Sequence, residues 1–248
     1  MAKNKIDLDL WGINEGSIQD NLCKATYGIG FYSDESNITE EEIKSKCNVI
    51  WRRMFSLCYS ISNSYTKDKN GREYTLCKEW YDYNNFKKWY DENYYELENE
   101  NVYFSPMCIK KNNTHFCPQL CVFVPQSILG LLYGYTKEEY KNKCVCGVQR
   151  VKRKDENKYS YKSVMKIAAE LNKGSDNYYI GTYDTAEEAF INYKIVKELY
   201  IKGVAYHYKD KIPEKLYNAM LNWEIEKDDN TVKYENSRTR KDIFRLQK

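Results

Sequence analysis

Four residues between positions 108 and 121 have side chains that can hold a metal ion: Cys108, His115, Cys117 and Cys121. Thiolate and imidazole groups are ligands that tetrahedral zinc prefers. The spacing differs from the paired Cys-x-x-Cys of zinc ribbons, and prolines lie within and beside the segment. Buried, reduced thiols that pack as small apolar groups are the alternative. The residue types therefore leave two interpretations open, a zinc site and a set of core cysteines.

A second candidate site is the excess of positive charge in region 140–173. This region holds ten Lys or Arg and three Asp or Glu, a net charge of +7, against +3 for the whole chain. Arg forms paired hydrogen bonds with guanine and Lys more often contacts phosphate, so these residues predict nucleic-acid binding. The candidates are Arg150, Lys152, Arg153, Lys154, Lys158, Tyr159, Tyr161 and Lys162. A solvated surface without a ligand is the other interpretation.

Negative charge gathers in the segment Asp91–Glu100, which holds five acidic residues and no basic one. The 248-residue chain is 42% hydrophobic and 30% charged, a composition typical of a folded protein. No apolar run approaches the roughly 18 residues of a membrane span, and the N-terminus lacks the apolar core of a secretory signal. Nine scattered cysteines without such a signal favour free thiols. We therefore expect a cytoplasmic protein with no membrane partner.

Hydrophobic spacing and capping residues predict an α+β fold. Helices are expected over Thr39–Tyr59 and Asn84–Asn93, with short extended pieces over 102–125 and a short helix over 128–133. Strand patterns begin at VCGVQRVKR and recur at YYIGTY, whereas 163–171 also has helical propensity. Thr185 and Glu188 form a capping box before a long helix, and Pro213 begins another. The expected domains are 1–138, 139–226 and a basic, mobile tail over 227–248.

The second half resembles a known family. The pieces that carry the resemblance are CGVQRVKRKDENKY from Cys146, GTYDTAEEA from Gly181 and YKDKIPEKLYNAML from Tyr208. They resemble the C-terminal part of a phage and prophage protein family, which is related to the plant ethylene-response-factor DNA-binding domain. The resemblance implies a small three-stranded antiparallel sheet packed on a long helix. Its strands would enter the major groove of duplex DNA.

The first half resembles the N-terminal part of the same family, which is related to HNH homing-type endonucleases. Its pieces are YGIG from Tyr27, WRRM from Trp51, CKEW from Cys77 and CVFVP from Cys121. Where relatives carry a Leu-Asp-Lys-Asp-like stretch, this chain has Phe104-Ser105-Pro106-Met107. The family's Asn remains as Asn113, with His115 nearby. Because an HNH site needs a base and a metal ligand, loss of both acids implies an HNH-like α/β module that does not cleave.

These observations give a leading hypothesis and an alternative. The leading hypothesis is a phage-type protein that binds double-stranded DNA in a sequence-directed way and carries an inactive nuclease-like module. The alternative is an anti-defence inhibitor, like an anti-CRISPR, that binds a host effector complex or its nucleic acid. Its contact surface would include acidic residues such as Glu96, Glu98 and Glu100. A surviving nuclease would need a divalent metal ion near Asn113 and His115; otherwise no cofactor is expected.

Overall fold

The computed structural model describes residues 26–34, 38–60, 66–68, 71–133, 143–153, 158–167 and 177–229. They divide into two compact units, one with 26–95 and 104–123, the other with 96–103 and 124–229. The expected boundary at residues 138 and 139, and the expected tail from residue 230 on, lie outside the described residues. The helix just before that boundary belongs to the second unit. Helices and strands are both present, so the α+β fold class is confirmed.

Residues 39–59 of the first unit form two helices where the spacing predicted one. Helix α2 (Glu40–Ile43) is capped by Thr39, and α3 (Lys46–Tyr59) is capped by Ser45. The hydroxyl of Ser45 accepts a hydrogen bond from the Asn48 N–H at 3.1 Å, as an N-cap side chain does. Hydrophobic periodicity continues through such a break, because the apolar residues before and after it still face one core.

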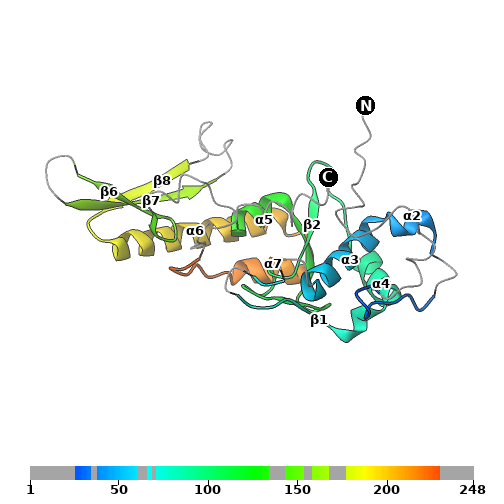
Figure 1. Cartoon of the computed structure of the whole chain (residues 1–248). Helices are drawn as coiled ribbons and strands as arrows, with labels where there is room; N and C mark the ends of the chain where they lie inside the picture. The colour runs from blue at the N-terminus through cyan, green and yellow to red at the C-terminus, as the bar shows by residue number, and fades with distance from the viewer. Residues whose placement is uncertain are drawn as a thin grey trace, which may run out of the picture. The chain divides into compact units, whose positions relative to one another are not determined.

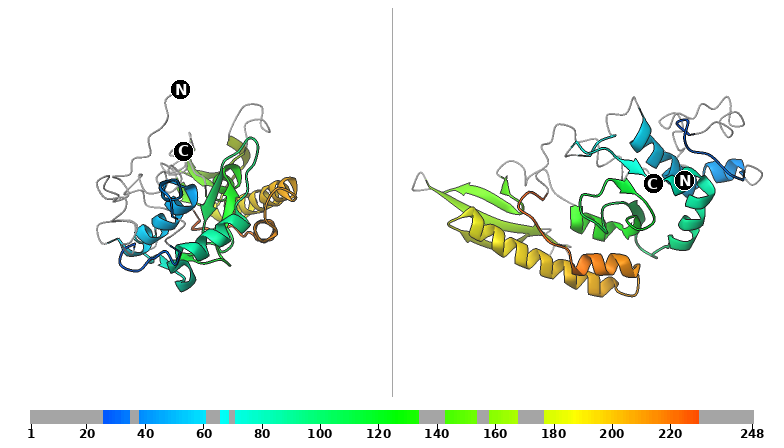
Figure 2. Two further views of the ribbon diagram at one scale, coloured as in Figure 1. Left: turned by 90° about the vertical axis from the view of Figure 1, so that its right-hand side faces the viewer. Right: turned by 90° about the horizontal axis from the view of Figure 1, so that it is seen from below.

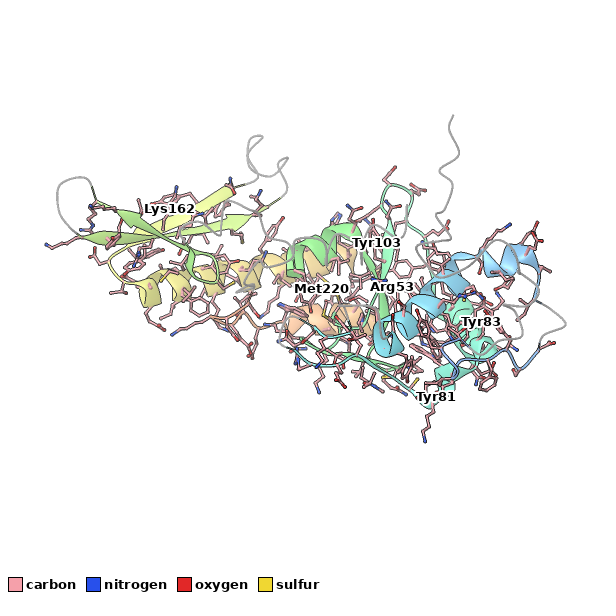
Figure 3. The ribbon with its side chains drawn as sticks, viewed as in Figure 1. Arg53, Tyr81, Tyr83, Tyr103, Lys162 and Met220 are labelled. Atoms are coloured by element: carbon pink, nitrogen blue, oxygen red, sulfur yellow. The ribbon has the colours of Figure 1, made fainter. Side chains whose placement is uncertain are left out.

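An aromatic core holds the first unit together. After β1 (Thr75–Leu76) comes a 3-10 turn, η4 (Lys78–Tyr81), and then α4 (Tyr83–Asn93). Trp51 and Trp80 are fully buried, and the Trp51 Nε1–H donates to the Trp80 carbonyl at 2.7 Å. The ring of Tyr83, which is labelled in Figure 3, contacts that of Trp51 at a centroid distance of 5.4 Å. The residues Trp80, Phe86, Trp89 and Tyr90 are buried and in mutual ring contact, which confirms their interpretation as core.

The short strands confirm the extended pieces expected over 102–125. The strand β3 (His115–Phe116) pairs in parallel with β1. The strands β2 (Val102–Ser105) and β4 (Val122–Pro125) form another two-stranded sheet. Helix α5 (Gln126–Tyr133) follows β4 directly. The strands are short because Pro106 and Pro118 remove N–H donors and fix φ.

The sheet of the second unit has four strands, so the expectation of three is wrong. The strands are β5 (Lys143–Val145), β6 (Val148–Lys152), β7 (Tyr159–Lys166) and β8 (Asn177–Tyr183), all antiparallel and in this order across the sheet. The sequence VCGVQRVKR is not one strand, because the chain turns back at Cys146-Gly147. Residues up to Lys166 in the ambiguous segment are strand.

Helix α6 (Ala186–Tyr208) runs along one side of this sheet in Figures 1 and 2. Thr185 caps it, and its hydroxyl accepts from the Glu188 N–H at 3.2 Å, which confirms the expected start of the helix. Helix α7 (Glu214–Leu221) follows Pro213 and packs on α6. Leu216, Met220 and Trp223 are buried as expected. Within the described ranges, no helix combines the length and apolar character needed to cross a bilayer.

Candidate nucleic-acid interface

The register of the four-stranded sheet defines which side chains share a face. Cross-strand partners point to the same side, and neighbours along a strand point to opposite sides. Val148 pairs with Ser163, and Ser163 pairs with Gly181. This row faces α6, because the buried Ser163 hydroxyl donates to the Ala189 carbonyl of that helix. The next row, Gln149 with Lys162 and Thr182, therefore lies on the opposite, outer face.

The outer face carries polar side chains, the exposed Val151 and an exposed aromatic ring. Tyr179, 54% exposed, pairs with Val164 on β7 after an irregularity in the β7–β8 register. Its hydroxyl and that of Thr182 are 2.9 Å apart, and the Lys162 ammonium lies 5.3 Å from its ring centroid. Figure 3 labels Lys162 on the sheet, and Figure 1 shows no helix of this unit on that side. Lysine, hydroxyl and amide groups thus stand together on a face that no described helix of this unit covers.

The predicted binding residues do not all lie on this surface. Arg150 pairs with Tyr161 and Lys152 with Tyr159, in rows on the same side as Ser163. These rows are near the start of α6, and the Arg150 guanidinium lies 4.5 Å from the Tyr159 ring centroid. Strand alternation thus divides the basic segment between two faces. Lys154 lies outside the described residues, and Lys158 is exposed just before β7.

Arg153 is already engaged by an acid. Its guanidinium forms an ion pair with the Asp184 carboxylate, and both side chains are well exposed. An exposed ion pair of this kind contributes only about 0–1 kcal/mol to stability. A DNA phosphate can therefore replace the Asp184 carboxylate at little cost in free energy. The positive charge of this surface is therefore smaller than the net charge of region 140–173 suggested.

Sequence reasoning missed Gln149, Tyr179 and Thr182 as candidate residues. All three are within the segments that were expected to be strands, but their common face depends on the pairing between strands. The turn at Gly147 and the irregularity in β7–β8 both change that pairing. Gln149 and Thr182 lie in pieces that carry the family resemblance, CGVQRVKRKDENKY and GTYDTAEEA, so these two residues could have been proposed from the sequence.

The nuclease candidates have structural roles. The Asn113 amide donates to the Pro106 and His115 carbonyls at 2.8 and 2.7 Å, and its oxygen accepts from the His115 N–H at 3.2 Å. The side chain therefore holds the turn before β3. The His115 Nδ1 is 2.9 Å from the Thr75 hydroxyl on the paired strand. The Ser105 hydroxyl accepts from the Met107 N–H at 3.2 Å. These groups offer no carboxylate to a divalent metal ion, and both amide hydrogens of Asn113 are bound by backbone carbonyls.

The zinc candidates do not form a ligand cluster either. In the ranges that the structure describes, no three His, Cys, Asp or Glu side chains converge to hold a metal ion. Cys108 and Cys121 are fully buried, and Cys117 is nearly so. The eight cysteines in these ranges are free thiols. The arrangement is that of core cysteines, which pack as small apolar groups.

Buried thiols make the first unit sensitive to alkali. Burial raises the pKa of Cys47, Cys58 and Cys108 from 9.0 to about 12. Unfolded thiols lose their protons near pH 9 while the folded ones retain them, so the free energy of unfolding should fall between pH 9 and 12. Urea denaturation at stepped pH measures this slope. We expect Cys108→Ala to reduce the slope and the exposed Cys144→Ala to leave it unchanged; equal slopes in all three proteins would contradict the prediction.

The acidic segment does not present all its carboxylates to solvent. Asp91 pairs with Lys87 at 3.4 Å. Glu100 accepts hydrogen bonds from the Ser127 N–H at 2.5 Å and from the Tyr208 hydroxyl at 2.6 Å. Glu96 and Glu98 are exposed. Of the three glutamates named for the inhibitor hypothesis, Glu100 therefore supports the fold of the second unit.

Comparison with known proteins identified no relative: no family model matches the chain, and neither the curated proteins nor the solved structures contain a significant match.

Proposed function

We propose that this protein binds double-stranded DNA through the outer face of the sheet β5–β8. The observation that carries the proposal is the row of Gln149, Lys162 and Thr182 across three strands, on the face opposite α6. The resemblance of this segment to the ethylene-response-factor domain also supports DNA binding by the strands of this sheet. The proposal includes a phage-type origin and sequence-directed binding.

The dimensions and chemistry of the row fit a major groove. Neighbouring strands are about 4.8 Å apart, so the row spans about 10 Å between Gln149 and Thr182. The major groove is about 12 Å wide and admits a β-ribbon. Gln can pair with adenine, Thr with several bases, and Lys with guanine or phosphate. Arg153 follows the last residue of β6, where its guanidinium is available to a phosphate backbone beside the row.

We propose further that the first unit is an HNH-like module without nuclease activity. The support is that Ser105 and Met107 replace the acids and that the Asn113 amide is bound by backbone groups. A general base and a metal ligand are both required for water attack on a phosphodiester. Duplex DNA should therefore remain uncut when the protein is incubated with magnesium.

A salt series tests the DNA-binding surface. Affinity for duplex DNA, single-stranded DNA and RNA is measured at several salt concentrations with the full chain. For duplex DNA we expect affinity to fall steeply with salt, and we expect Lys162→Ala to reduce the salt slope by about one. Lys209→Ala, which removes an exposed cation after α6, is the matched control and should leave the slope unchanged.

A second pair of variants distinguishes the two faces. Arg150→Ala with Lys152→Ala removes the cations on the α6 side of the sheet. If this double variant abolishes duplex binding while Lys162→Ala has no effect, the outer face is not the interface. No binding to any nucleic acid at moderate salt would contradict the whole proposal and favour the inhibitor hypothesis, which charge reversal at Glu96 and Glu98 then tests.

A further inference from the structure

Helix α6 exposes large apolar side chains on the side away from its own core. Ile191, Ile195 and Leu199 are 48, 52 and 63% exposed, although helix positions of this size usually pack against a neighbour. Their spacing of four residues places them on one face. The buried residues Ala189, Tyr193, Ile201 and Ala205 lie on the other side, toward the sheet and α7. An apolar row of this kind typically marks an interaction surface.

Two exposed charges of opposite sign flank this row symmetrically. Glu188 lies seven residues before Ile195, and Lys202 lies seven residues after it. Ile191 and Leu199 lie four residues before and after the same residue. The sequence of chemical types on this face is therefore acid, apolar, apolar, apolar, base. We call these five residues, Glu188, Ile191, Ile195, Leu199 and Lys202, the α6 seam.

The neighbouring charges on α6 are engaged within the unit. Lys194 donates to the Ile225 carbonyl at 3.0 Å and pairs with Glu198 at 2.8 Å. Glu198 also accepts from the Ile225 N–H at 2.8 Å. Glu187 forms an ion pair with Lys227. Residues 225–227 thus bind along one flank of the helix, while Glu188 and Lys202 remain exposed on the seam.

We propose that the α6 seam binds a second copy of this chain, with the two helices antiparallel about a two-fold axis at Ile195. In an isologous interface the same residues face each other from both sides. The axis places Ile195 against the partner's Ile195, and Ile191 against the partner's Leu199. Glu188 then faces the partner's Lys202, twice by symmetry. A parallel arrangement would instead bring like charges together at both ends, which is unfavourable.

The small size of the α6 seam determines how strongly two copies should associate. Five residues a side is far below the roughly 20–30 residues a side of a standard interface, so association should be weak and concentration-dependent. Because the seam and the sheet lie on opposite sides of α6, the outer face of each sheet stays open in the dimer. The inference is independent of the proposed DNA binding, since it concerns the protein alone.

Sedimentation equilibrium of the full chain without nucleic acid tests the proposal. The average mass should rise with concentration from 29.6 kDa toward twice that value. Ile195→Lys should hold the protein at the monomer mass over the same range. Val151→Lys, the same change at a 43% exposed apolar residue on the outer face of the sheet, is the matched control and should still dimerise.

A charge exchange makes the test specific for the antiparallel pairing. Glu188→Lys and Lys202→Glu should each weaken dimerisation by roughly tenfold or more, because like charges then face each other at both ends. The chain with both substitutions should dimerise again. Within one helix these residues are fourteen positions, or about 21 Å, apart, so recovery cannot arise inside a single chain. A constant monomer mass in the unchanged protein, or no recovery in the double variant, would overturn the proposal.

Discussion

Replacement of Gly147 by alanine should lower the free energy of unfolding of the second unit by about 3 kcal/mol or more. Gly147 has φ of +70°, in the left-handed region that L side chains rarely adopt. An added Cβ would also lie well under 3.0 Å from ring carbons of the buried Tyr193. The strain is therefore both conformational and steric. Urea denaturation followed by far-UV circular dichroism measures the loss.

Two further variants test this explanation: the first is a control at another glycine, and the second removes the steric clash. Gly203→Ala, at an exposed site of α6 where a Cβ meets no atom within 4 Å, should instead stabilise the protein by up to about 1 kcal/mol. Tyr193→Ala in the Gly147→Ala background removes the ring and should cost less than the two single changes added together. Wild-type stability of Gly147→Ala would show that the hairpin tolerates a side chain and would contradict the close packing on Tyr193.

The same glycine shows where sequence reasoning succeeded and where it stopped. The long helix was predictable from Thr185 and Glu188, because a capping box depends only on residues within one turn. The strand pattern around Gly147 was visible too. The turn at Cys146-Gly147 could not be predicted, because Val145 before it and Val148 after it fit the pattern of one continuous strand. This turn divides one expected strand into β5 and β6, so the sheet has four strands instead of three.

The candidate site was predictable by region but not by face. Positive charge in region 140–173 marked the sheet β5–β8 as a candidate surface, since charge is a property of composition. Which side chains stand together depends on register, a non-local property that an irregularity alters. Lys162 lies on the outer face, whereas Arg150 lies on the side of α6. Similarly, residue types made Cys108 and Cys117 credible zinc ligands, but convergence is a tertiary property.

The first unit shows how distant pieces of sequence combine. The YGIG and WRRM pieces, which carry part of the resemblance, meet in the core: a Cβ on Gly30 would lie 2.8 Å from Phe55 Cζ and 3.1 Å from Trp51 Cη2. The Phe31 N–H donates to the Tyr81 carbonyl at 2.9 Å, beside the CKEW piece. These three sequence pieces therefore meet in one packed core, although they are far apart along the chain.

Trp51→Ala should have the largest effect on the first unit, a loss of about 3–5 kcal/mol in the free energy of unfolding. Trp51 is fully buried, and its ring contacts those of Tyr32, Phe55 and Tyr83 at centroid distances of 4.9–5.4 Å. Its removal also leaves the buried Trp80 carbonyl without the indole donor. Trp51→Phe retains the ring packing and should lose only about 1–3 kcal/mol. Phe31→Ala, which removes a 49% exposed ring, is the control and should lower the free energy of unfolding by less than about 1 kcal/mol.

Hydrogen exchange resolved along the chain locates the effect of Trp51→Ala. Amides of α3 and α4 should lose protection, whereas those of β6, β7 and α6 should retain it, because Trp51 belongs to the first compact unit and these three elements belong to the second. If the outer face of the sheet binds duplex DNA, the affinity of Trp51→Ala should stay within about twofold of wild type, while Gly147→Ala should lose binding together with the sheet. Loss of DNA binding in Trp51→Ala with full protection of β6, β7 and α6 would show that the first unit contributes to the interface. The assignment of binding to the sheet alone would then be wrong.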